Sequence, residues 1–314
     1  MFAEDSAFSE KNQKVFIHTD KLHGMINVET DQGGNPISAM FDTENVIASK
    51  WGNLIPKYKA DDVRTKYRSA LELYSEGSLR SIYLQNRIEV KTAVGKLNAE
   101  FITFYESGAI KRVFPLYGQL SGYWTQNDEY ELSEEANLKL FSDGKETMVR
   151  PLCLYFYPEG QLHSITVWPQ SPMMVETAYG RVRTRIGVEF SADGKILSIE
   201  PEIGTKIITG FGKMYPYDSG AIGINADYNS LRFDKNGQLT ECRTIHSKVT
   251  VRDASGGYTE LRPESIKSTI KEETVILTPM TLQFLKKYLL VKRKNRNDMI
   301  LDRRKYEIRF QNNM

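Results

Sequence analysis

Cysteine and histidine stand close together at one place in this chain, Cys242 and His246, which are four positions apart. A thiolate beside an imidazole can act as a nucleophile or supply two ligands of a metal site. Cys242, however, fills a position of a recurring turn motif that is otherwise aliphatic, as in Ile82, Val113, Ile165 and Ile199. Because a buried free cysteine behaves as a small hydrophobic residue, we interpret Cys242 as a core residue. With four scattered histidines, the sequence predicts no catalytic residue, no metal site and no cofactor.

Acidic residues offer a second route to chemistry, since a glycosidase needs only two facing carboxylates. The candidates in or beside the expected strands are Glu100, Glu106, Glu189 and Glu200. Acidic residues in strands mostly lie on the solvated face, and sequence spacing does not show which of them meet. A hydrolase with paired carboxylates on the sheet face is therefore the second alternative for function.

Residues 116–132, LYGQLSGYWTQNDEYEL, interrupt the recurring pattern and carry three aromatic candidates, Tyr117, Tyr123 and Trp124. Aromatic faces can stack on sugars, bases or a peptide. Loops that depart from a regular scaffold often carry binding residues. We expect these three side chains to contact a ligand or partner, whereas the aromatic residues beside the regular turns are explained by packing between units.

Basic residues gather toward the C-terminus, where KRKNR covers residues 292–296 and DRRK covers residues 302–305. From residue 265 onward there are twelve Lys and Arg and five Asp and Glu, although the net charge of the chain is only +2. Residues 286–305 could contact the phosphates of anionic lipid or nucleic acid. Lysines that protect a sheet edge from aggregation explain the same residues without a ligand. The predicted contact residues are Lys292, Arg293, Lys294 and Arg296.

The elements that must position these residues are indicated by a glycine turn that recurs with the same neighbours. The five clear copies are LYSEGSLRSI, FYESGAIKRV, FYPEGQLHSI, FSADGKILSI and FDKNGQLTEC, with glycines at Gly77, Gly108, Gly160, Gly194 and Gly237. A polar residue followed by Gly predicts a hairpin whose second central residue has a positive φ. We count FDTENVI as a further copy with Asn45 in the glycine position, because Asn tolerates left-handed backbone.

A second turn motif alternates with the first, as VETDQG, VKTAVG, VETAYG and IITGFG, with SKWG as a relative. Its glycines are Gly33, Gly95, Gly180, Gly212 and Gly52. Together the two motifs give a unit of strand, T-x-x-G turn, longer strand and F-x-x-x-G turn. Successive units advance by about 32 residues, with insertions in two of them.

Strand segments between the turns alternate apolar and polar residues, as in RVRTRIGVEF at residues 181–190. Such alternation buries one face of a strand and exposes the other. Antiparallel sheets tolerate one wet face, whereas parallel sheets have continuous apolar runs. The sequence therefore predicts an all-β fold, an antiparallel array of β-hairpin repeats in a meander or solenoid-like arrangement.

Composition agrees with a folded protein, since 11% of the 314 residues are aromatic and 40% are hydrophobic. The N-terminal segment has acidic residues and no apolar run, so we expect neither a signal peptide nor an anchor. Two cysteines are too few for a disulfide framework, and we predict a cytoplasmic protein. The predicted domains are a mobile extension over residues 1–23, the repeat array over 24–263 and a basic cap over 264–314.

The cap allows two interpretations of residues 279–292. A helix beginning near Pro279 would be capped by Thr278 and would place Leu282, Leu285 and Leu289 on one face. The alternating pattern instead predicts three strands, marked by Met280, Leu282 and Phe284, by Leu289 and Val291, and by Tyr306, Ile308 and Phe310. We favour three strands that close the sheet, because a meander needs an end cap.

At the F-Y-x-x-G-x-L turns, in FYESGAIK and FYPEGQLHS, the chain resembles the bacterial MORN-variant repeats, the membrane occupation and recognition nexus type also seen in antitoxin-like repeat proteins. The resemblance covers residues 41 to 244 and lacks the double glycine of standard MORN units. It implies a β-hairpin array that holds proteins or membrane lipids without catalysis, and it carries over no functional residue.

We therefore expect a non-catalytic β-repeat scaffold that binds a protein partner along its exposed face. The first alternative is a module that binds a small ligand, a lipid or a polyanion through exposed aromatic residues and the basic C-terminal segment. The sequence identifies neither the partner nor the oligomeric state.

Overall fold

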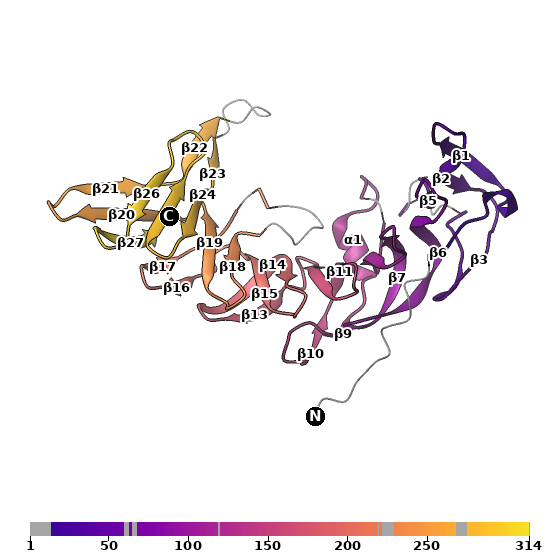
Figure 1. Cartoon of the computed structure of the whole chain (residues 1–314), viewed down its shortest axis with the longest axis horizontal. Helices are drawn as coiled ribbons and strands as arrows, with labels where there is room; N and C mark the ends of the chain where they lie inside the picture. Colours follow the sequence, from indigo (N-terminus) through magenta and orange to yellow (C-terminus); the bar gives the residue numbers. More distant parts are fainter. Residues whose placement is uncertain are drawn as a thin grey trace. The chain divides into compact units, whose positions relative to one another are not determined.

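The computed structural model describes residues 14–59, 63–64, 68–118, 120–218, 220–221, 229–267 and 275–313. The chain divides into two compact units (Figure 1), which we call unit 1 (residues 1–165 and 192–194) and unit 2 (residues 166–191 and 195–314). Nearly every element is a strand with antiparallel neighbours, so the predicted all-β, hairpin-built fold is confirmed. The units begin and end at other residues than the predicted domains, whose boundaries stay predictions.

The main sheet of unit 1 has the strand order β1-β2-β5-β6-β7-β8-β11-β12. These strands are β1 (Met25–Thr30), β2 (Pro36–Phe41), β5 (Leu71–Leu73), β6 (Leu79–Thr92), β7 (Gly95–Phe104), β8 (Ile110–Phe114), β11 (Pro151–Phe156) and β12 (Leu162–Val167). Two short hairpins join β3 (Ile47–Ser49) to β4 (Gly52–Leu54) and β9 (Ala136–Lys139) to β10 (Glu146–Val149). The helical elements among the residues that the structure describes are the 3₁₀ turn η2 (Thr19–Lys21) and the helix α1 (Gln126–Glu131).

The main sheet of unit 2 has the order β14-β15-β18-β19-β24-β25-β26, with β13 beside β14. These strands are β13 (Met173–Thr177), β14 (Gly180–Phe190), β15 (Ile196–Pro201), β18 (Leu231–Phe233), β19 (Leu239–Thr244), β24 (Met280–Phe284), β25 (Tyr288–Lys292) and β26 (Met299–Asp302). A second sheet, of order β16-β17-β27-β20-β21, contains β16 (Ile207–Thr209), β17 (Gly212–Met214), β20 (Ser247–Asp253), β21 (Tyr258–Leu261) and β27 (Tyr306–Asn312). A separate two-stranded ribbon consists of β22 (Glu264–Lys267) and β23 (Val275–Thr278).

The strand interpretation of residues 279–292 is confirmed by β24 and β25. The prediction that residues 306–310 close the same sheet is wrong, because β27 pairs with β20 and β17 instead. The strand beside β25 is β26, whose sequence MILD is short and lacks the alternation on which we relied.

Of the predicted N-terminal extension, residues 1–13 lie outside the described part. Residues 15–17 run beside the turn at Gly77, where the Ile17 amide donates to the Gly77 carbonyl at 3.0 Å. The Leu79 amide donates to the Val15 carbonyl at 2.8 Å, and Lys14 lies 3.0 Å from the carboxylate of Glu76.

The F-x-x-x-G turns share one backbone geometry. Their glycines have positive φ angles of 84°, 83°, 96°, 77° and 74° at Gly77, Gly108, Gly160, Gly194 and Gly237. In the first copy, the Gly77 amide donates to the Tyr74 carbonyl at 2.9 Å and the Tyr74 amide donates to the Ser78 carbonyl at 2.8 Å. The loop therefore has three residues with the glycine forming a bulge, whereas we predicted a two-residue loop. The predicted positive φ is confirmed, and it explains why glycine is required there.

Asn45 is not a further copy of this turn, so that prediction is wrong. Its side chain is buried and holds the segment before β1, because Asn45 Nδ2 donates to the His23 carbonyl and Oδ1 accepts from the His23 amide, both at 2.8 Å. Among the described residues, Asn27 is the only non-glycine residue with a positive φ.

The first turn of this type instead lies between β1 and β2, with Gly34 at φ 82°. Asp31 Oδ1 accepts from the amides of Gly33 (2.8 Å) and Asn35 (2.9 Å). VETDQG at Gly33 is therefore not a T-x-x-G turn. The spacing of Gly34, Gly52 and Gly77 matches that of Gly194, Gly212 and Gly237, so two stretches of the chain have the same order of turns.

The T-x-x-G turns depend on their hydroxyl residue as well as on glycine. Thr177 Oγ1 donates to the Gly180 carbonyl at 2.7 Å and accepts from the Tyr179 amide at 3.1 Å. The same two bonds form at Ser49, Thr92 and Thr209. The side chain thus satisfies two backbone groups that the tight loop leaves without a strand partner.

Apolar side chains line up in register across each main sheet. The row in unit 1 is Ala39, Leu71, Ile82, Ile102, Val113 and Leu154. The row in unit 2 is Val188, Ile199, Leu231, Cys242, Leu282 and Val291. All of these side chains are buried, which confirms that Cys242 is a core residue.

Aromatic residues at the tips of the T-x-x-G turns contact the same face of the sheet. Trp51 lies against Phe104 with ring centroids 5.0 Å apart, and Tyr179 lies against Phe233 at 6.2 Å. Beside the F-x-x-x-G turns, the hydroxyl of Tyr74 donates to the carbonyl of Phe104 at 2.8 Å. These contacts support the interpretation of turn aromatics as packing residues. The strand neighbours of the apolar rows, such as Tyr83 and Phe101 in unit 1 and Ser198 and Arg232 in unit 2, point to the opposite face of each sheet.

Candidate functional site: an arginine-lined groove and two buried ionic networks

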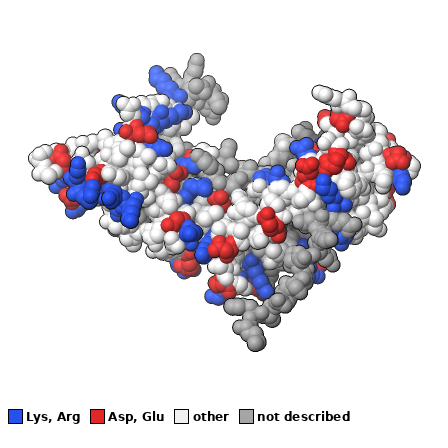
Figure 2. Space-filling view, in the orientation of Figure 1, with Lys and Arg blue, Asp and Glu red and all other residues white. Residues whose placement is uncertain are grey.

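The predicted basic cluster is divided between the two ends of β26. Residues 293–296 form the turn that leads from β25 into β26, and residues 303–305 form the turn that leads away from it. Lys292 ends β25, and Lys294 and Arg296 are exposed. Figure 2 shows Lys and Arg side chains beside the β22–β23 ribbon and over β20 and β27 of unit 2. The predicted cluster is therefore not one continuous surface.

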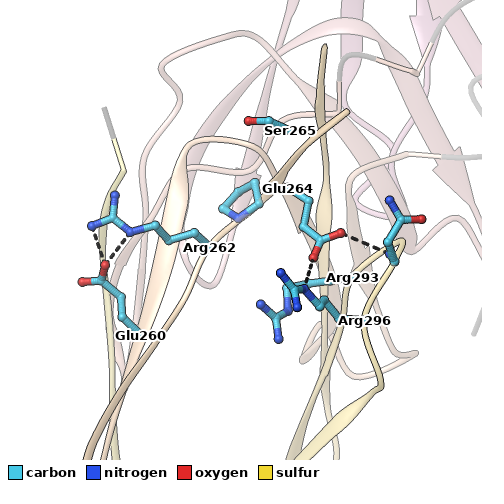
Figure 3. Close-up of a pocket in the computed structure, with 8 residues that line it drawn as sticks. Glu260, Arg262, Glu264, Ser265, Arg293 and Arg296 are labelled. Carbon is cyan, nitrogen blue, oxygen red and sulfur yellow. Dashed lines mark hydrogen bonds and ion pairs between the residues drawn. The ribbon is translucent and has the colours of Figure 1, made fainter. Parts of the chain in front are cut away.

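One end of β26 borders an open groove of about 570 Å³ (Figure 3). Its lining residues come from the end of β21, the start of β22 and the β25–β26 turn: Glu260, Arg262, Pro263, Glu264, Ser265, Arg293, Asn295 and Arg296. Proline has no amide hydrogen, so Pro263 ends the pairing of β21 with β20 and redirects the chain into the ribbon. The groove therefore combines Arg293 and Arg296, which the sequence predicts as contact residues, with three charged residues that it does not predict: Glu260, Arg262 and Glu264. Lys248, also not predicted, is connected to the groove through its ion pair with Glu260.

Two ion pairs form opposite walls of the groove. On one wall Glu260 contacts both Arg262 and Lys248, the latter at 2.7 Å. On the other, Glu264 accepts from Arg296 Nε at 3.0 Å and from the Asn295 amide at 3.1 Å. Hydrogen bonds from Lys248 and then Arg262 lower the pKa of the Glu260 carboxyl, so it is ionised at neutral pH.

Arg293 differs from the other two arginines of the groove. Arg293 is half-buried, and its guanidinium has no ion pair and no hydrogen bond among the described residues. A planar guanidinium can bind a carboxylate or phosphate through two parallel hydrogen bonds. The groove therefore offers one free bidentate donor, Arg293, beside Arg296 on one wall (Figure 3), and the carboxylates of both walls are already neutralised.

The predicted aromatic contact residues are found in unit 1 and have different environments. Tyr117 stacks on Phe101 with ring centroids 4.1 Å apart, and the guanidinium of Arg68 lies 3.8 Å above its ring. Trp124 Nε1 donates to Glu129 at 2.8 Å. Tyr123 is 89% exposed. Tyr117 and Trp124 therefore help to hold the loop together, and Tyr123 alone of the three presents an open aromatic surface.

Arg64 binds two carboxylates in the interior of unit 1. Its guanidinium reaches both oxygens of Glu100 at 2.6 Å, and both oxygens of Glu129 at 2.8 and 2.7 Å. Glu129 also accepts from the amide of Gly118 at 2.7 Å. Burial raises the pKa of the Glu129 carboxyl, but the donors Arg64, Gly118 and Trp124 outweigh burial and leave it below its ordinary value.

Helix α1 presents Glu129 to this network. Thr125 caps the helix, since its hydroxyl accepts from the Asp128 amide and the Asp128 carboxylate accepts from the Thr125 amide. The pattern T-x-x-D at residues 125–128 is the sequence signal for this helix start, because it allows a capping box. No local sequence pattern identifies Arg64 as the partner of these carboxylates, because Glu100 and Glu129 are 36 and 65 residues away.

Glu200 has a different environment in the interior of unit 2. It accepts from the Ser230 amide at 2.7 Å and hydroxyl at 2.6 Å, and it has a single contact with Arg185 at 3.3 Å. Arg185 also donates to the carbonyls of Asp218 (2.7 Å) and Ala221 (3.0 Å). Glu200 is fully buried, and burial outweighs these donors and raises its pKa.

The remaining chemical candidates do not form a reactive site in the described part. Burial raises the pKa of the Cys242 thiol well above its ordinary value, which removes its nucleophilic form. Of the acidic candidates, Glu100 meets Glu129 through Arg64, while Glu189 accepts from Ser198 at 2.6 Å. The described residues contain no group of His, Cys, Asp and Glu that could hold a metal ion.

No protein-family model, no curated protein and no solved structure matches this chain. Within the described part, no helix combines the length and the apolar character needed to cross a lipid bilayer.

Proposed function

We propose that this protein is a non-catalytic β-repeat scaffold that binds a protein partner, with the groove between Arg262 and Arg296 as the docking site. The groove supports this proposal because it is open, it is lined by charged side chains, and Arg293 has no partner among the described residues. The recurring turns would supply a rigid support, as hairpin arrays related to MORN repeats do, and a cytoplasmic location belongs to the same proposal.

The carboxylates of unit 1 argue against the hydrolase alternative. A glycosidase requires two carboxyl groups that can both reach a substrate. Glu100 and Glu129 are instead held by Arg64, with side-chain exposures of 8% and 4%. Their oxygens are occupied by Arg64 and by the amides of Tyr117 and Gly118, so neither carboxylate is available to a substrate as an acid or base.

Site-specific photo-crosslinking tests the proposed docking site. A photoreactive amino acid in place of Ser265 should form an adduct of defined mass with one protein in a native lysate. The same residue in place of Lys96, an exposed position in unit 1, should not form this adduct. Adding Arg293→Glu to the Ser265 variant should abolish it. An adduct that persists with Arg293→Glu, or that forms equally from position 96, would contradict docking at the groove.

A second candidate is the binding of anionic lipid or nucleic acid by the other end of β26. There the turn at Lys286 and Lys287 adjoins the turn at residues 303–305, since the Arg303 amide donates to the Lys287 carbonyl at 3.0 Å. Arg304 forms an ion pair with Asp302 at 2.8 Å, so this end of β26 has fewer unpaired basic side chains than the sequence predicts. Binding to phosphatidylserine vesicles or to a DNA oligonucleotide that Lys286→Glu with Lys287→Glu abolishes would favour this candidate.

A further inference from the structure

The ribbon of β22 and β23 exposes apolar side chains beside the groove. Val275, Ile276 and Leu277 are 61%, 42% and 38% exposed, although they are consecutive in a strand. Consecutive strand residues point to opposite faces, so both faces of the ribbon carry apolar surface. In the described part, β23 pairs with β22 alone, and Figure 1 shows the ribbon projecting from unit 2.

The register of the ribbon connects this apolar surface to the arginines. Leu277 lies directly opposite Ser265, which lines the groove, and Val275 lies opposite Lys267. Residues that are directly opposite in an antiparallel pair share one face. Leu277 and Val275 therefore lie on the ribbon face that carries Ser265. Because Ser265 lines the groove, the ribbon face that carries Leu277 and Val275 adjoins it.

We propose that this surface binds an extended acidic segment of the protein partner, in which acidic and apolar residues alternate. The inference rests on the proposed function and names the chemistry of the partner. Carboxylates of the segment bind the free guanidinium of Arg293 and the exposed guanidinium of Arg262, and its apolar side chains cover Val275 and Leu277. An extended chain matches this arrangement because its side chains alternate in direction.

The charges of the groove favour a peptide over a membrane or a nucleic acid. Glu260 and Glu264 also line the groove, and their negative charges would oppose a continuous array of phosphates. A concave site also contacts a flat bilayer poorly, whereas an extended peptide can enter it. Exposed apolar side chains on the adjoining ribbon add surface that a nucleic acid backbone does not use.

The full-length protein can be tested with a fluorescent peptide of alternating Glu and Val, followed by anisotropy at low salt. We expect saturable binding that weakens as salt rises, because charged hydrogen bonds at an open site are screened. Arg293→Glu should weaken binding at least about tenfold, since it removes a charge-assisted contact and adds repulsion. Leu277→Ser should weaken it about threefold through lost apolar contact.

Two controls isolate the proposed chemistry. Arg304→Ala should leave affinity unchanged, because Arg304 is bound by Asp302 at the other end of β26. Peptides of alternating Lys and Val, or of alternating Glu and Ser, should bind poorly. The inference is overturned if Arg293→Glu or Leu277→Ser has no effect, if the Glu and Ser peptide binds equally well, or if phosphatidylserine vesicles bind in preference to the peptide.

The peptide and crosslinking experiments fail in distinguishable ways. If position 265 captures a partner but the peptide of Glu and Val does not bind, docking at the groove stands and the acidic chemistry is wrong. If the peptide binds and no partner is captured from position 265, the acidic specificity stands and the scaffold proposal is wrong.

Discussion

The two units have the same type of glycine turn, but they place different residue types at one equivalent strand position after it. The sixth residue after the glycine is Tyr83 for Gly77 and Phe114 for Gly108, on strands of unit 1, but Glu200 for Gly194 and Arg243 for Gly237, on strands of unit 2. All four side chains are buried. Unit 1 therefore places aromatic rings at this position and, although Glu100 lies on β7, brings Arg64 from a connecting segment. Unit 2 places the charges on the strands themselves.

This difference decides how each unit accommodates a buried carboxylate. Glu129 in unit 1 has four strong donors, two of them from the fork of Arg64, and its pKa falls below the ordinary value although burial opposes this. Glu200 in unit 2 has two short bonds from Ser230 and a longer contact with Arg185, and burial raises its pKa. The direction of the pKa shift therefore depends on the balance between burial and the number and geometry of the donors.

The largest expected effect comes from Arg64→Leu, which leaves Glu100 and Glu129 buried without their cation. We expect a loss of about 3–5 kcal/mol in the stability of unit 1, the usual range for breaking a buried pair. Native-state hydrogen exchange of β6 and β7 would measure the loss in unit 1 separately. Arg183→Ala is the matched control, because Arg183 is exposed in its pair with Glu202, and its effect should stay within about 0.5 kcal/mol. Equal effects of the two variants would contradict a central role for Arg64.

Glu129→Gln and Glu200→Gln should respond to pH in opposite directions. A carboxyl group whose pKa is lowered by folding stabilises the native state above its unfolded pKa. This stabilisation is lost as pH falls through the folded pKa. The loss of about 2 kcal/mol expected for Glu129→Gln at pH 7 should therefore shrink in acid.

The sign reverses for Glu200, whose folded pKa is raised. Its contribution is fully present below the unfolded pKa and is lost as pH rises through the folded pKa, so Glu200→Gln should gain stability relative to the wild type across that window. Urea unfolding as a function of pH, followed separately for each unit by hydrogen exchange, measures both. Parallel pH profiles for the two variants would show that the two sites are not different.

A matched pair of glycines compares the turns of the two units. Gly52 and Gly212 end equivalent T-x-x-G turns with φ of 97° and 116°. A Cβ at Gly52 meets no atom within 4 Å, whereas at Gly212 it would lie 2.9 Å from the Phe310 carbonyl, because β27 runs beside it. Gly52→Ala should cost about 1–2 kcal/mol from backbone strain, and Gly212→Ala distinctly more. Thermal unfolding measures the difference, and equal costs would mean that β27 moves aside.

The smallest expected effect concerns the hydroxyl of the same turns. Thr177→Val keeps the shape but removes the bonds to Gly180 and Tyr179, and we expect a loss of about 1 kcal/mol. Thr177→Ser retains the hydroxyl and should restore most of the stability. Unfolding curves in urea compare the two, and a valine variant as stable as the serine variant would show that the hydroxyl does not hold the turn.

Much of the architecture could be predicted because its signals are local. A glycine with positive φ lies in every clear F-x-x-x-G turn, and the row that includes Cys242 follows from its alignment with Ile82 and Ile199. The prediction for Asn45 was wrong because asparagine is common in two different structural roles, as a left-handed turn residue and as a side-chain hydrogen-bonding partner of the backbone. Asn45 has the type expected of a left-handed residue, yet its amide binds His23.

The groove could be predicted only in part. Arg293 and Arg296 were candidates because basic residues cluster in the sequence. Arg262 and Glu264 were not, since a single arginine or glutamate beside a proline has no distinctive pattern. Their relation to Arg293 depends on a pairing across about 30 residues, as in the bond of Arg296 to Glu264.

The sequence by itself determined the strands, the turns between them and the face of each strand that is buried, because these depend on residues within one or two turns of each other. The tertiary structure decided which carboxylates are neutralised, where β27 pairs and which arginine is left without a partner. Those outcomes depend on segments that are far apart in the chain, and only folding brings their charges within a few ångströms, where electrostatic energies become large.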